Sequence, residues 1–213
     1  QRFHLLLSSE DDDLRNENLK DARTERQLAE ADDTSLALQY TQERSIDFSL
    51  THRLKVDLED ELNPQVRTRI RYSIPIADES VLTLAQAFFW ESKEGFGEES
   101  RLDYDVPLSE TMLLRTTGQG LFTESSKGYE WLGMKQLLKS FSHKKALAVG
   151  AYVAGETRPQ SHVTEYDAYL KYRQRIIKKW LFIEFKPEVK WPREKDFDPV
   201  GIFTLTLELQ FQD

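Results

Sequence analysis

Four arginines are the residues whose type and spacing most directly suggest chemistry. Arg67, Arg69 and Arg71 occupy every second position, so their side chains share one face if the segment is a β-strand. Arg53 lies in the preceding segment, which alternates in the same way. A row of guanidinium groups can hold carboxylate or phosphate groups through paired hydrogen bonds. We therefore expect a basic track for a small anionic solute.

Acidic side chains with matching alternation are the candidate partners of these arginines. They are Asp47, Asp103, Asp105, Glu165, Asp167 and Glu184. Charges that are paired and hydrogen-bonded are the form in which ions are tolerated away from bulk water. A second interpretation is therefore a structural network of ion pairs that fills the interior and binds no solute. The sequence leaves both interpretations open.

Residues for enzyme or metal chemistry are sparse. The chain has no cysteine, which removes thiolate nucleophiles and thiolate metal sites. No histidine has a serine two positions away that would share its face in a strand; the histidines are His4, His52, His143 and His162. We expect no catalytic residues, no metal and no cofactor. Lipid hydrolysis by a serine and a histidine on different strands is the minor alternative.

Apolar side chains recur at every second position along most of the chain. From 46 to 58 the even positions are apolar, apart from His52, and the odd ones are polar or charged. The same alternation recurs in 66–74, 82–90, 102–108, 166–173, 181–191 and 203–211. It is weaker in 112–122, 131–138 and 147–153, and short strands are expected at 2–8 and 35–41. A period of two indicates β-strands, so we expect an all-β chain of about twelve strands, with ten to twelve allowed.

The links between these segments alternate in length. Short links are expected at 42–45, 77–79, 107–110, 141–144 and 175–178, and mostly longer ones at 59–64, 91–100, 157–160 and 192–199. Tight turns at one end and larger loops at the other are typical of outer-membrane barrels. The sequence therefore predicts an antiparallel, up-and-down transmembrane β-barrel that forms a single domain from 1 to 213.

A soluble barrel would show the same alternation with its apolar face turned inward. Aromatic side chains near the predicted strand ends favour the membrane, because aromatic girdles lie at the two lipid interfaces. These side chains are Tyr40, Tyr72, Trp90, Tyr172, Trp191 and Phe211. We expect Leu50, Leu54, Leu205 and Leu207 to face lipid.

Residues 9–34 differ from the rest in composition. Between Glu10 and Asp33 there are ten acidic and four basic residues, and three leucines are the only large apolar ones. Such a segment cannot bury a face of its own. We expect a long, acidic, extracellular loop after the first strand.

The overall composition limits the partners. Of 213 residues 31% are charged, and the formal net charge is −8. An acidic balance argues against nucleic acid as a partner. The first residues, from Gln1 on, lack the basic start and apolar run of a signal peptide. We therefore expect that a signal peptide is absent from this chain.

Three segments carry a resemblance to a known family. They are KKWLFIEFKPEVKWPREKDFDP at 178–199, YRQ at 172–174 and GYEW at 128–131. With these segments the chain resembles an uncharacterised family of outer-membrane β-barrel proteins of Gram-negative bacteria. The resemblance implies a place in the bacterial outer membrane, with its lipid and lipopolysaccharide as partners, and implies no substrate.

Two functions follow as expectations. The first is a small porin-like conduit for polar or anionic solutes. The second is a closed barrel with a structural, adhesive or assembly role and no transport activity.

Overall fold

The computed structural model describes residues 2–8, 35–45, 47–57, 63–76, 79–92, 95–126, 128–142, 144–177 and 181–209. Within these ranges the regular structure is twelve β-strands and one short 3-10 helix, η1, at Arg193–Lys195. The strands are β1 (Arg2–Ser8), β2 (Ser35–Ser45), β3 (Phe48–Asp57), β4 (Asn63–Pro75), β5 (Val81–Glu91), β6 (Gly95–Ser109), β7 (Met112–Thr123), β8 (Tyr129–Ser142), β9 (Lys145–Glu156), β10 (His162–Ile177), β11 (Leu181–Pro192) and β12 (Val200–Leu209). The predicted loop at 9–34 and Phe211 lie outside the described residues.

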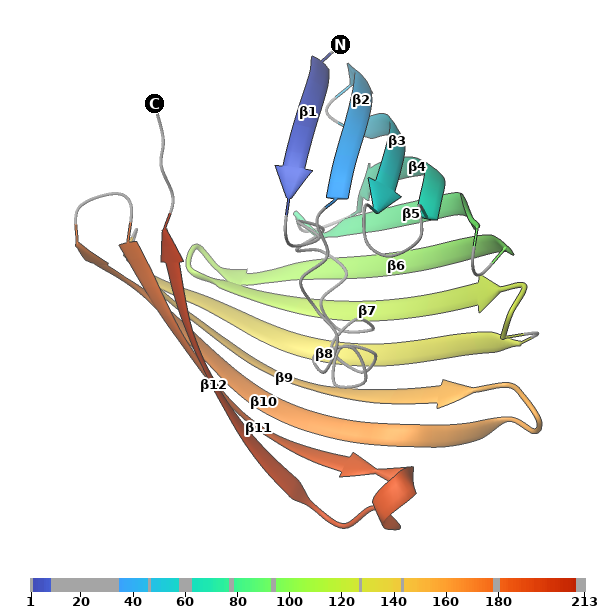
Figure 1. Ribbon diagram of the computed structural model, residues 1–213. Coiled ribbons are helices and arrows are strands. Elements are labelled where there is room, and N and C mark those ends of the chain that lie inside the picture. The colour runs from blue at the N-terminus through green and yellow to red at the C-terminus, as the bar shows by residue number, and fades with distance from the viewer. Residues whose placement is uncertain are drawn as a thin grey trace. The chain divides into compact units, whose positions relative to one another are not determined.

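The strands follow one another in a single sheet in the order of the sequence, from β1 to β12. Figure 1 shows this succession by its colours. The register is antiparallel from β1 to β4 and from β8 to β12. The prediction of an all-β, antiparallel, up-and-down chain of about twelve strands is confirmed.

The chain forms two compact units. The first comprises Gln1–Tyr72, Ala85–Ser100 and Leu121–Lys127, and the second comprises Ser73–Leu84, Arg101–Gly120 and Gly128–Asp213. The first unit therefore contains β1 to β3 and most of β4. The second contains β8 to β12 in full.

Each unit has one apolar and one polar face, because successive side chains of a strand point to opposite sides. We call them the apolar face and the polar face. Large apolar side chains on the apolar face are exposed: in the first unit Leu54, Val66, Ile70, Tyr72, Phe88 and Trp90, and in the second Leu102, Tyr104, Leu108, Val149, Tyr166, Leu170, Val189, Phe203, Leu205 and Leu207. Leu50 lies on the same face and is half-buried. The polar residues of these strands alternate with them on the opposite face.

Several strands are longer than predicted. β2, β6 and β10 run to Ser45, Ser109 and Ile177, so they take up most of the links expected at 42–45, 107–110 and 175–178. Residues 91–100 were also expected to form a long link, but β6 begins at Gly95. Between Gly95 and Ser100 the only large apolar side chain is Phe96, so the period-two signal is missing there. The correction places Gly97 and Glu99 within the strand.

Candidate functional site

The arginine row lies on the polar face of β4, next to β3. In the register of these strands Arg53 pairs with Arg67, Thr51 with Arg69, and Ser49 with Arg71. Like charges directly opposite each other on one face destabilise a sheet. The pairing of Arg53 with Arg67 is therefore unfavourable unless an anionic group lies close to them.

Glu99 of β6 supplies such a group within the first unit. Arg67 Nη2 donates a hydrogen bond to Glu99 Oε2, and Arg69 Nη2 lies 4.0 Å from the same oxygen. The Glu99 side chain is only 7% exposed, whereas the two arginine side chains are each 23% exposed. The carboxylate is thus largely withdrawn from solvent, while the guanidinium groups remain partly accessible.

An aromatic ring supports this ion pair. Arg67 Cζ lies 5.4 Å from the centre of the Phe89 ring, within the range of a cation–π contact. The ring also covers Gly97, where an added Cβ would overlap it. We call Arg67, Arg69, Phe89, Gly97 and Glu99 the Glu99 cluster.

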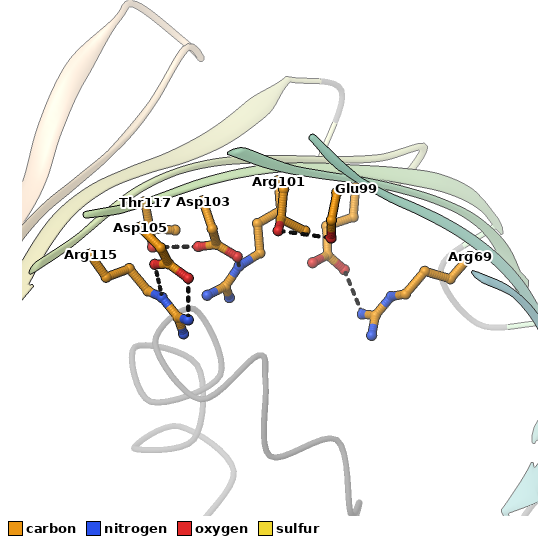
Figure 2. Close-up of polar contacts among 9 residues, drawn as sticks. Arg69, Glu99, Arg101, Asp103, Asp105, Arg115 and Thr117 are labelled. Atoms are coloured by element: carbon orange, nitrogen blue, oxygen red, sulfur yellow. Dashed lines mark hydrogen bonds and ion pairs between the residues drawn. The ribbon is translucent and has the colours of Figure 1, made fainter. Parts of the chain in front are cut away.

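Farther along β6, in the second unit, two predicted acids have other partners. Asp103 accepts hydrogen bonds from Arg101 Nε at 2.9 Å and from Thr117 Oγ1 at 2.6 Å. Asp105 accepts two from Arg115, at 2.7 and 2.8 Å. Figure 2 shows these pairs, together with the Arg69–Glu99 pair of the first unit. The carboxylates of Asp103 and Asp105 therefore neutralise Arg101 and Arg115.

The remaining predicted acids lie in the second unit, except for Asp47. Glu184 pairs with Lys171 at 3.3 Å, and Glu165 accepts a hydrogen bond from the Tyr152 hydroxyl. Asp167 is only 2% exposed and lies opposite Lys190 in the register. Asp47 is exposed in the turn before β3.

A second aromatic residue covers a glycine on the polar face. The Tyr169 ring lies against Gly150, so that an added Cβ there would come within 2.7 Å of it. Gln136 Nε2 donates a hydrogen bond to the Tyr169 hydroxyl at 2.8 Å, and Lys186 Nζ lies 5.6 Å from the ring centre. These contacts hold the ring over Gly150.

Replacing Gly150 with Ala should therefore destabilise the protein by about 1 to 3 kcal/mol through overpacking. Urea titration of the refolded protein measures this change. Gly133→Ala is the matched control, because its Cβ would meet Val153 at an ordinary 3.8 Å. That variant should gain about 0.4 to 1 kcal/mol from the reduced freedom of the unfolded chain. Equal effects of the two substitutions would contradict the packing of Tyr169 over Gly150.

The sequence reasoning missed Glu99, because this residue fell in the wrongly predicted link. Tyr169 stands between Asp167 and Lys171, and its parity agrees with its place on the polar face.

Within the described residues, no group of three or more His, Asp or Glu side chains is arranged to hold a metal ion. His52 Nδ1 lies 3.0 Å from Thr68 Oγ1, and His162 Nδ1 lies 2.6 Å from the Gln160 carbonyl oxygen. Over the same part of the chain, no helix has the length and apolar character needed to cross a membrane.

Comparisons with known proteins give matches among solved structures. No protein-family model matches the chain, and no curated protein matches it. A KdgM porin is 11% identical, with 85% of this chain and 94% of that chain covered and a TM-score of 0.49. A KdgM porin in complex with disordered oligogalacturonate is 10% identical and a NanC porin 6%; for each, the coverage is 84% of this chain and 94% of that chain and the TM-score is 0.49.

Proposed function

We propose that this protein is a β-barrel of the bacterial outer membrane that acts as a small porin-like conduit for polar or anionic solutes. The observation that carries the proposal is the contrast between the two faces of the sheet. One face exposes large apolar side chains on many strands, and the other carries charged residues in ion pairs. Soluble proteins rarely expose so much contiguous apolar surface, whereas a membrane barrel turns such a face to lipid.

Closure of the sheet is part of the proposal. A sheet that spans a membrane must satisfy its edge hydrogen bonds, because the hydrocarbon region offers no water. A closed transmembrane barrel meets this requirement, and in this proposal lipid and lipopolysaccharide surround it.

The preference for anions rests on the first unit. The polar face of β3 and β4 carries Arg53, Lys55, Arg67, Arg69 and Arg71. Glu99 contacts Arg67 and Arg69, and the guanidinium groups of these two arginines stay partly exposed. Rings and rows of basic groups favour anions in a water-filled path.

A closed barrel with a structural, adhesive or assembly role is the second candidate. It is favoured by the packing of the polar face in the second unit, where several side chains are almost fully buried. These are Tyr152, Asp167, Tyr169, Glu188 and Lys190. A face packed in this way can fill a lumen.

Replacing Arg69 with Glu should abolish or reverse the anion preference, because it puts a carboxylate into the basic track beside Glu99. Reversal potentials of the refolded protein in planar bilayers measure the change. Arg193→Glu is the control, since it makes the same charge change at an exposed position in η1. An unchanged anion preference in the Arg69 variant would contradict the proposed role of the track.

A further inference from the structure

Glu99 has a position that an arginine track for anions does not itself explain. It is a nearly buried carboxylate on the polar face, and it contacts two of the arginines through one oxygen. In this arrangement the protein's own carboxylate occupies the place in which the track would hold the carboxylate of a solute.

Neighbouring side chains hold the arginine partner of this carboxylate in place. Phe89 fixes one side of the Arg67 guanidinium, and Gly97 leaves room for the ring. Arg53 lies opposite Arg67 in the register and adds positive charge beside it. A planar guanidinium that is held in place by a ring is suited to carboxylate geometry, because little freedom is lost on binding.

We propose that the Glu99 cluster is a carboxylate-binding subsite in which Glu99 is the resident ligand. The subsite takes the carboxylate group of a small solute when the Glu99 side chain is displaced, and so it sets how strongly the track selects anions. This inference rests on the proposed conduit, and it names the chemical group that the conduit recognises.

Exchange of one carboxylate for another conserves the interactions of the arginines. Arg67 and Arg69 keep an acceptor in both states, so the buried guanidinium edges are never left without an anion. A solute that lacks a carboxylate cannot make this exchange. The partial exposure of both arginine side chains leaves a route for a small anion to reach them.

Chemical rescue tests the subsite without any measurement of transport. Glu99→Ala removes the resident carboxylate and leaves a space the size of acetate. The variant should lose heat resistance of the folded band on a gel, and sodium acetate should restore most of it. Sodium chloride at equal ionic strength and neutral acetamide should restore little. Glu98→Ala is the control, because this neighbour points to the opposite face of β6, and acetate should leave its heat resistance unchanged.

Glu99→Gln provides a second readout and keeps the volume of the side chain. In planar bilayers its ratio of anion to cation permeability should rise at least about twofold over that of the wild type, whereas Glu98→Gln should match the wild type. If Glu99→Ala folds only when acetate is present during refolding, the subsite is supported.

Two results would overturn the inference: equal rescue by acetate, chloride and acetamide, or equal permeability ratios in the two Gln variants. A wild type that folds but does not conduct would instead contradict the proposed function. In that case the acetate rescue still decides whether the carboxylate subsite exists.

Discussion

Replacing Leu205 with Arg should lower the free energy of unfolding by about 2 to 4 kcal/mol and impair insertion into membranes. Leu205 lies at the middle of β12, opposite Phe185 of β11, and its exposed fraction is 53%. If the apolar face contacts lipid, the substitution puts a charge into the hydrocarbon region near its centre. Urea titration in lipid vesicles measures the loss of stability.

Thr204→Arg is the matched control for this prediction. Thr204 precedes Leu205 in β12 and pairs with Lys186 of β11, so its side chain belongs to the polar face. An arginine there adds the same charge on the side away from lipid, and the loss should be far smaller. Equal losses in the two variants, or normal insertion of Leu205→Arg, would contradict the assignment of the faces.

Replacing Lys190 with Met should destabilise the protein by about 3 to 5 kcal/mol, because it breaks a buried ion network on one side. The Lys190 side chain is 4% exposed, and its Nζ lies 3.7 Å from Glu188 Oε1. Lys190 is also the register partner of Asp167. Without the ammonium group, two buried carboxylates would face each other with less compensation. The temperature at which the folded band converts on a gel measures the effect.

The double variant Asp167→Asn/Lys190→Met removes one charge of each sign and should recover much of this loss. Lys195→Met is the control, since Lys195 is exposed in η1. Should the single and double Lys190 variants lose the same stability, the charges of Asp167 and Lys190 would not be coupled.

Alternation made most of the fold predictable. In β3 and β4 polar and apolar positions alternate, apart from His52 and Thr68, so both the strands and their faces could be read from the sequence. The order of the strands followed from short links such as those at 107–110 and 141–144. Where β6 begins with Gly95, Phe96 and Gly97, small residues hide the period, and the start of the strand was missed.

The candidate site could be predicted only in part. The spacing of Arg67, Arg69 and Arg71 predicted that they share one face, because the face to which a side chain points depends only on its own strand. The partners of each carboxylate depend on the register between strands, which the sequence does not specify. For this reason Asp103 and Asp105 were expected beside the arginine row, whereas their bonds are to Arg101 and Arg115, and the acid that contacts the row is Glu99.

Single-channel recording of the refolded wild-type protein tests the central claim most directly. We would first verify folding by the heat-dependent shift of the band on a gel, and then record in a planar bilayer under a potassium chloride gradient. We expect discrete conductance steps and a reversal potential that indicates preference for chloride. Silent bilayers from verified, folded protein, or a preference for potassium, would contradict the proposal of an anion-selective conduit.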